Sequence, residues 1–190
     1  MEMAPNCPPS TNEETSTFRL LRQAAQGGLS PEQAIQLQRA TSDALGHQAA
    51  ILVVDDDDPM RMVLMLTLRA LGYQNLAEAA DGEAALAALR DRDFDLLVSD
   101  IQMPGMDGFA LLTAIKSDPF LRHLPVIVAS GMNELEAVAR CIEMGAEDFL
   151  PKPVNSTILR ARVTASLERK RLRDLERLRL IELQQEKQLL

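Results

Sequence analysis

Residues 51 to 64 read ILVVDDDDPMRMVL, in which four aliphatic residues lead directly into four aspartates. A short aliphatic run rich in β-branched residues and closed by polar ones is typical of a buried strand. A helix-like pattern follows the aspartates, and Pro59 suits the first position of a helix. We therefore predict a strand over 51–54, an acidic turn, and a helix with Asp58 as its N-cap.

The same alternation of strand and helix patterns continues along the chain. Further strand-like runs lie at 75–79, 94–99, 125–129 and 147–150, of which the first is the weakest, and helical patterns separate them. Nearly continuous apolar strands imply that both faces of a sheet are buried. The predicted fold is therefore α/β, a doubly wound five-stranded parallel sheet with helices on both sides.

In such sheets, ligands bind beyond the carboxyl ends of the strands, near the point where the strand order reverses. Polar residues gather at these predicted ends: Asp55 and Asp56 after the first strand, and Asp100, Ser130 and Lys152 after later ones. Three carboxylates that face one another repel unless a cation neutralises them, and such oxygen ligands suit Mg²⁺. A lysine and a hydroxyl are suited to hold a phosphoryl group.

Each of these residues also has a plainer interpretation. An aspartate after a strand can merely cap a loop, but the aspartate pair and the lysine favour chemistry at Asp100. Serine is common in loops between strands and helices, so Ser130 alone carries little weight. Asp57 is expected to be exposed, and Asp107 is expected to N-cap a helix that begins near Gly108.

Several separated motifs resemble those of one known family, the receiver domains of two-component response regulators. The motifs are VVDDDDP (53–59), LLVSDIQMPGMDG (96–108), VIVASG (126–131) and FLPKPV (149–154). No single motif is decisive, but their order and spacing together are specific. The resemblance covers about residues 50–167 and implies a flavodoxin-like receiver fold.

The resemblance assigns a chemical role to the acidic residues. Asp100 would be the phospho-acceptor, taking a phosphoryl group from a sensor histidine kinase or a phosphotransfer protein. Asp55, Asp56 and Asp100, together with the backbone carbonyl of Gln102, would hold Mg²⁺. Asp55 and Asp56 of the acidic run would then serve a metal site, which explains in part why like charges stand side by side.

The resemblance also assigns roles to residues of the last two strands. Lys152 would pair with Asp100 and then with the phosphoryl group, and Ser130 would donate a hydrogen bond to a phosphoryl oxygen. Phe149 matches an aromatic switch position, with a simple core role equally open because aromatic packing needs no further function. The bond between Lys152 and Pro153 is expected to be cis.

Composition and charge limit the classes of function that the chain can have. The 190 residues are 46% hydrophobic, include no Trp and carry a net charge of −8. This balance suits one globular domain with extensions and argues against nucleic-acid binding by the chain, which needs a basic surface. Two cysteines without CxxC spacing give no disulfide framework. Without a secretory pattern or an apolar run long enough to span a membrane, we expect a cytoplasmic protein.

The two ends of the chain are expected to lie outside the receiver-like region at 50–167. Residues 1–16 are rich in Pro, Ser, Thr and Glu and are expected to be disordered. Residues 17–49 are expected to form a helical extension, with short helices at 17–26 and 30–46. Residues 168–190 are expected to continue the last helix as a signalling helix or coiled coil, since no Gly or Pro follows Pro153.

Leucines in this last segment predict a homodimer. Leu167, Leu178 and Leu189 recur every eleven residues, with Leu172 and Leu175 nearby, a period that fits a straight or slightly right-handed seam between two parallel helices. Arg171 and Glu182 interrupt that seam. The alternative is a solvated, charged helix without a partner.

The sequence therefore predicts a signal receiver that is phosphorylated and dephosphorylated, not an enzyme with substrates of its own. Phosphorylation would shift a two-state surface and pass the change through the C-terminal helix to an output domain or a partner. The helical pattern continues to Leu190, which favours a longer regulator whose output, for example a cyclase or phosphatase, lies outside this chain. A stand-alone protein-interaction module is the alternative. An independent hydrolase is disfavoured because no substrate pocket is evident.

Overall fold

The computed structural model describes residues 48–131 and 135–188. The tail predicted at 1–16 and the helices predicted at 17–26 and 30–46 lie outside the described residues. Strands and helices alternate in the described part of the chain. In chain order they are β1 (Ile51–Val54), α3 (Asp58–Ala70), β2 (Leu76–Ala79), α4 (Gly82–Asp91), β3 (Leu96–Asp100), α5 (Gly108–Ser117), β4 (Val126–Gly131), α6 (Leu135–Glu143), β5 (Asp148–Lys152) and α7 (Ser156–Gln188).

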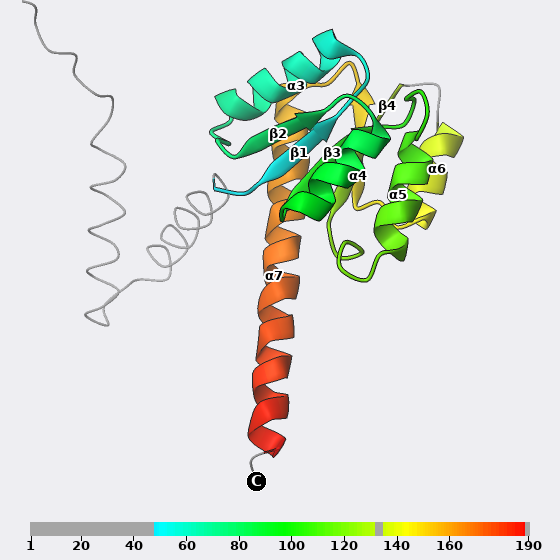
Figure 1. Ribbon diagram of the computed structural model, residues 1–190. Coiled ribbons are helices and arrows are strands. Elements are labelled where there is room, and N and C mark those ends of the chain that lie inside the picture. The colour runs from blue at the N-terminus through cyan, green and yellow to red at the C-terminus, as the bar shows by residue number, and fades with distance from the viewer. Residues whose placement is uncertain (1–47, 132–134, 189–190) are drawn as a thin grey trace, which may run out of the picture. The chain divides into compact units, whose positions relative to one another are not determined.

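The five strands form one parallel sheet in the order β2-β1-β3-β4-β5 (Figure 1). β1 lies between β2 and β3, so the strand order reverses at β1. The doubly wound parallel sheet predicted from the sequence is confirmed. Because open α/β sheets bind ligands at this reversal point, the carboxyl ends of β1 and β3 are the place to look for chemistry.

Each face of the sheet has its own buried core, because successive strand residues point to opposite faces. Leu52 and Val54 of β1 pack on one face with helices α4, α5 and α6. Ile51 and Val53 pack on the other face with α3 and α7. Every residue of β1 and β3 is buried, which explains why β1 is entirely apolar and why β3 begins with three apolar residues.

The strands that carry the site extend further than predicted. β3 includes Asp100, β4 includes Ser130, and β5 includes Lys152, whereas the predicted strands stopped short of all three. The sheet register explains the difference, since Asp100 is paired with Ala129 and Lys152 with Gly131. Pairing with a neighbouring strand thus overrides the polar character of these residues.

The start of α3 differs from the prediction by one residue. Asp57 is the N-cap, and its side chain makes no capping hydrogen bond. Asp58 is the first helical residue, and its carboxylate pairs with Arg61 one turn further on. The prediction of Asp58 as the cap was wrong because Pro59 takes the second helical position rather than the first. The predicted cap of α5 is confirmed, since Asp107 accepts from the third residue of that helix at 2.8 Å.

Helix α7 runs for 33 residues, which confirms the long C-terminal helix. Its first turns pack on the same face of the sheet as α3, and Leu167 still contacts that core. From Arg171 to Ile181 every residue is exposed, and the helix continues past the sheet (Figure 1). Of the three leucines in the predicted seam, Leu167 therefore packs within its own chain, Leu178 is exposed, and Leu189 lies outside the described residues. No helix within the described ranges is both long and apolar enough to cross a membrane.

Candidate functional site

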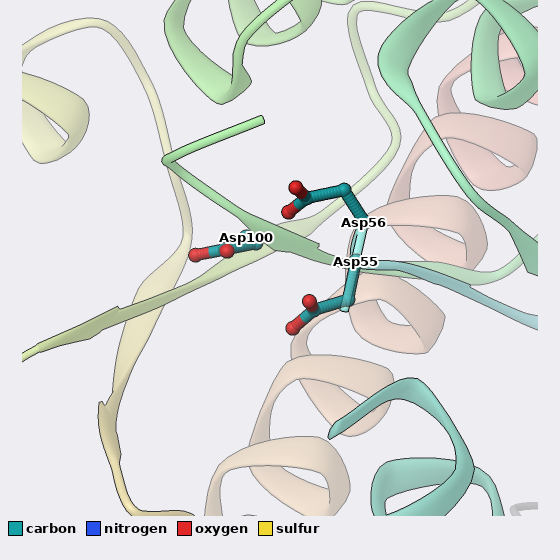
Figure 2. A group of neighbouring side chains, drawn as sticks. All are labelled: Asp55, Asp56 and Asp100. Atoms are coloured by element: carbon teal, nitrogen blue, oxygen red, sulfur yellow. The ribbon is translucent and has the colours of Figure 1, made fainter. Parts of the chain in front are cut away.

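Three carboxylates meet where the strand order reverses. Asp55 and Asp56 follow β1, and Asp100 is the last residue of the neighbouring strand β3. One carboxylate oxygen from each lies within 4.8 Å of the other two. Figure 2 shows the three side chains extending to the same side from the ends of the two strands. The fold thus brings together the aspartates that the sequence singled out.

A lysine from another strand, β5, reaches into this acidic cluster. The Nζ atom of Lys152 lies 2.8 Å from Oδ2 of Asp100 and 3.0 Å from Oδ2 of Asp55. The Asp55 side chain is fully buried and that of Lys152 is mostly buried, so these charges interact more strongly than they would in water. Lys152 therefore bridges two of the three carboxylates and offsets part of their repulsion.

The pKa values of Asp100 and Lys152 both differ from their ordinary values. Burial raises the pKa of the Asp100 carboxyl above its ordinary value, and the charge of Asp55 adds to the rise. Hydrogen bonds from Lys152 and from the Ile101 N–H oppose that rise without cancelling it. Burial alone would lower the pKa of Lys152, but its hydrogen bonds to Asp100 and Asp55 raise it above its ordinary value. Lys152 is therefore an ammonium at neutral pH, one cation among three acidic groups.

Backbone groups orient two of the carboxylates. The N–H of Ile101 donates to Oδ1 of Asp100 at 2.7 Å, and the N–H of Asp57 donates to Oδ1 of Asp55 at 3.0 Å. In both aspartates the backbone thus holds one oxygen while the other faces Lys152. The two side chains are oriented by the protein itself, which is the arrangement that a precise binding site requires.

Arg61 supports the acidic turn, a role that was not predicted from the sequence. Its Nη1 atom donates to the backbone carbonyl of Asp55 at 2.6 Å, and its Nε atom donates to Glu78 of β2 at 3.3 Å. The same guanidinium pairs with Asp58. Arg61 therefore ties the turn after β1 to the adjacent strand and engages two acids outside the three-aspartate cluster. The three-residue spacing from Asp58 to Arg61 is a sequence signal for the pair between these two residues, but not for the contacts with Asp55 and Glu78.

Gly108 allows the start of α5 to lie against the end of β3. A Cβ at this position would lie 2.4 Å from the backbone oxygen of Asp100 and 2.7 Å from Cα of Ile101. The N–H of Gly108 also donates to the carbonyl of Ile101 at 2.9 Å. The position thus requires glycine for close backbone approach, a contact that the sequence did not reveal beyond the Asp107 cap.

Ser130 and Gln102 lie at the same sheet edge as the aspartates. Ser130 is buried near the end of β4, and its hydroxyl donates to the carbonyl of Gly131 at 3.2 Å. Gln102 is exposed, two residues beyond the end of β3. The bond between Lys152 and Pro153 is cis, as expected.

Phe149 is half-buried in β5 and contacts the C-terminal helix. The guanidinium of Arg162 in α7 lies 4.8 Å from the centre of the Phe149 ring, a favourable cation–π arrangement. Arg162 also pairs with Asp148, the residue before Phe149. The strand that ends at Lys152 is therefore linked through its aromatic residue to α7.

The acidic cluster fits a small divalent cation that prefers oxygen. Mg²⁺ binds oxygens at about 2.0–2.1 Å in an octahedron, so ligands on opposite sides lie roughly 4.2 Å apart. The carboxylate oxygens, all within 4.8 Å of one another, need only a small contraction to reach that spacing. Asp55 is buried and Asp56 is exposed, which leaves one side of the cluster open to solvent and to a ligand.

Comparison with known proteins agrees with this fold. The family model described as the response regulator receiver domain matches residues 51–164. The chain belongs to the response regulator receiver family of two-component signalling. The resemblance seen in the sequence motifs is therefore confirmed.

Individual relatives match the same part of the chain. The chemotaxis protein CheY of Pseudomonas aeruginosa is 38% identical over 119 residues, which is 63% of this chain and 96% of CheY. The regulator NtrC of Salmonella typhimurium is 44% identical over 109 residues, which is 56% of this chain but 22% of NtrC. The crystal structure of NtrX from Brucella abortus aligns with a TM-score of 0.64 at 36% identity, covering 69% of this chain and 29% of NtrX. The similarity thus centres on the receiver, which some relatives join to much longer chains.

Proposed function

We propose that Asp100 accepts a phosphoryl group from a phosphohistidine of a sensor histidine kinase or a phosphotransfer protein. The observation that carries this proposal is the contact of Lys152 with Asp100 beside two further carboxylates at the reversal point of the sheet. A carboxylate with a cation beside it and further acids to bind a metal is suited to receive phosphate. The chain would then be a signal transducer rather than an enzyme with substrates of its own.

The proposed transfer depends on positioning, because a carboxylate is a weak nucleophile. An oxygen of Asp100 forms a bond to phosphorus while the bond from phosphorus to the donor's imidazole nitrogen breaks, and that imidazole takes up a proton. The Ile101 N–H holds the carboxylate in place. Lys152 moves from Asp100 to the phosphoryl group, and the hydroxyl of Ser130 donates to a phosphoryl oxygen.

The proposed metal ligands are Asp55, Asp56, Asp100 and the backbone carbonyl of Gln102, and the proposed metal is Mg²⁺. Lys152 supplies a single positive charge against three acidic groups, so a divalent cation completes the neutralisation of the site. When bound, Mg²⁺ supplies positive charge next to the phosphoryl oxygens as their charge grows.

The proposed signal leaves the site through β5 and α7. Lys152 ends β5, Phe149 lies three residues earlier in the same strand, and Arg162 of α7 contacts both the Phe149 ring and Asp148. A shift of Lys152 towards a phosphoryl group therefore has a short path to the helix, with Phe149 as the switch residue. An output domain or a partner would read the helix.

We also propose that two chains associate through α7 as a homodimer. The exposed part of the helix carries six large apolar side chains, and a monomer leaves all of them in water: Leu172, Leu175, Leu178, Leu180, Ile181 and Leu183. The same residues support a second candidate function, a stand-alone interaction module in which α7 binds a partner protein and no catalytic output follows. The two candidates differ in whether phosphorylation of Asp100 changes what α7 binds.

The acceptor is tested with Mg²⁺ and a small phosphodonor such as acetyl phosphate, followed by intact mass measurement. We expect the wild type to gain one acid-stable, base-labile phosphoryl group. Asp57→Asn should label normally, since Asp57 is an exposed member of the same aspartate run. Asp100→Asn should not label, and labelling at the wild-type level would exclude Asp100 as the acceptor.

A further inference from the structure

Helix α7 has one face that is committed to its own receiver. Leu159, Val163 and Ser166 are completely buried on that face. Lys170 continues the row with an ion pair to Asp95, at 3.1 Å, just before β3. These residues recur every three or four positions and therefore form one stripe along the helix, which we call the inner stripe.

Ion pairs extend the inner stripe to the edge of the receiver. Arg169 and Arg173 both pair with Glu147, the residue before β5, and the Arg173 contact is 3.1 Å long. Each pair is partly exposed and is individually weak. Together they fix which side of α7 faces the receiver at the point where the helix leaves it.

A second stripe lies on the opposite side of α7. Its residues are spaced by three, four, seven and three positions, which is the spacing of a heptad seam, and we call it the outer stripe: Ile158, Ala161, Ala165, Leu172 and Leu175. At 3.6 residues per turn, the outer stripe lies about 150° around the helix from the inner stripe. The side chains of Leu172 and Leu175 are 61% and 52% exposed. The stripe therefore runs from the receiver into the free helix, is apolar except at position 168, and is largely uncovered within the described part of the chain.

We propose that a second copy of this chain covers the outer stripe, with the two α7 helices parallel. This inference rests on the homodimer proposed above and specifies its contact face and its orientation. Each receiver lies on the inner side of its helix, so two helices can meet at their outer stripes with the receivers facing away from each other. A dimer through Leu167 and Leu178 would instead use a residue that already packs on the receiver.

Charges beside the outer stripe fit a parallel partner. With Leu172 and Leu175 in the two core positions of the heptad, Arg171 and Glu176 occupy the flanking positions that pair across a parallel dimer five residues apart. Neither residue forms an ion pair within the part of the chain that the structure describes. The next flanking pair along the helix is Leu178 with Leu183, which adds apolar contact. Because the two chains are related by twofold symmetry, parallel pairing places Arg171 of each chain next to Glu176 of the other.

Glu168 is the one charged residue at a core position between Ile158 and Leu175. The apolar core ends at Leu175 because the next two core positions are Arg179 and Glu182. In a parallel dimer the two copies of Glu168 face each other, and a polar residue at such a position fixes register at a cost in stability. The outer stripe is therefore expected to give a reversible dimer in one register rather than a very tight one.

The contact face is tested by light scattering with two matched substitutions. Leu175→Glu places a charge in the outer stripe, whereas Leu180→Glu changes an equally exposed leucine about 140° away around the helix. We expect a wild-type dimer at tens of micromolar, a monomer for Leu175→Glu, and a dimer for Leu180→Glu. A dimer that survives Leu175→Glu overturns the outer stripe but leaves a homodimer in place. A wild-type monomer overturns the homodimer itself.

Parallel orientation is tested by exchanging the flanking charges. Arg171→Glu and Glu176→Arg each replace an attraction by a repulsion in both symmetric pairs, so each should weaken the dimer roughly fivefold. The double variant restores opposite charges and should return the dissociation constant to the wild-type value. Phosphorylation of Asp100 in these variants reports that the receiver remains folded. A double variant as weak as the single variants overturns the parallel register.

Discussion

The ammonium of Lys152 lies 2.8 Å from the carboxylate of Asp100 and also contacts Asp55, although 97 residues separate Lys152 from Asp55 in the chain. This contact joins the last strand of the sheet to its reversal point. Asp100 nevertheless keeps a raised pKa, because burial outweighs the attraction of one lysine. The site is therefore incompletely neutralised by the protein alone, and its charge balance can be tested by substitution.

Asp100→Asn should stabilise the fold at neutral pH. The pKa of Asp100 is raised above its ordinary value of 3.8, so ionising it costs folding free energy. That cost is absent below the ordinary pKa, develops as the pH rises towards the raised pKa, and persists above it. Removal of the charge should raise the free energy of unfolding by roughly 1 kcal/mol at pH 7, within the range common for single stabilising substitutions, and much less at pH 3.

Urea unfolding at both pH values measures this difference. Asp107→Asn is the matched control, since asparagine caps a helix as well as aspartate does and Asp107 lies outside the cluster. A less stable Asp100→Asn protein at pH 7 would show that the contact with Lys152 outweighs the cost of burial.

Asp56→Ala should weaken the binding of Mg²⁺ while Asp57→Ala should not. Both residues are exposed members of the same run, but Asp56 belongs to the cluster of converging carboxylate oxygens. Loss of a direct ligand should lower the affinity by about tenfold or more, because even the groups that merely orient metal ligands contribute that much. Isothermal titration calorimetry provides the comparison. Equal affinities for the two variants would mean that Asp56 is not a ligand.

The sequence was informative where the structure depends on local rules. Burial on both faces makes β1 and the first three residues of β3 apolar, so the parallel sheet was predictable. The cap of α5 by Asp107 follows from neighbouring residues alone. The exact ends of the strands were not predictable, because Asp100 and Lys152 are held by pairing with residues from other parts of the chain.

Side-chain contacts between distant segments of the chain were the main feature that the sequence did not predict. Arg61 of α3 reaches Glu78 of β2, and Arg162 of α7 covers the ring of Phe149. No periodicity in the sequence encodes such contacts. The convergence of Asp55, Asp56 and Asp100 was predictable, because all parallel strands end at one edge of the sheet. Locating a site where the strand order reverses needs only the order of the strands and no knowledge of individual side-chain contacts.

Gly108→Ala should destabilise the protein, and Gly131→Ala should not. A Cβ at Gly108 would meet backbone atoms of Asp100 and Ile101, which cannot move aside as a flexible side chain can. Nothing lies within 4 Å of a Cβ at Gly131. Forcing extra volume into the packed site should cost about 1–3 kcal/mol in the free energy of unfolding. Thermal unfolding of the two variants tests the contact, and equal stability would mean that α5 can shift without cost.

Arg61 is expected to act as a positioning residue for the acidic turn. Its guanidinium donates at once to the Asp55 carbonyl and to Glu78, and it pairs with Asp58, a set of contacts that needs the fork of an arginine. Arg61→Lys keeps the charge but not the fork. We therefore expect Arg61→Lys and Arg61→Ala to slow phosphorylation of Asp100 by about tenfold at saturating Mg²⁺, since small displacements of reacting groups lower rates strongly.

The rate of phosphorylation should be measured against Arg69→Ala, which removes an exposed arginine from the last turn of the same helix. That control keeps the turn intact and changes the net charge by the same amount as Arg61→Ala does. If positioning is the role of Arg61, the two Arg61 variants should resemble each other and differ from the control. A wild-type rate for Arg61→Lys would show instead that the turn needs only a positive charge near Asp58 and Glu78, and that the fork contact with the Asp55 backbone does not set the geometry of the site.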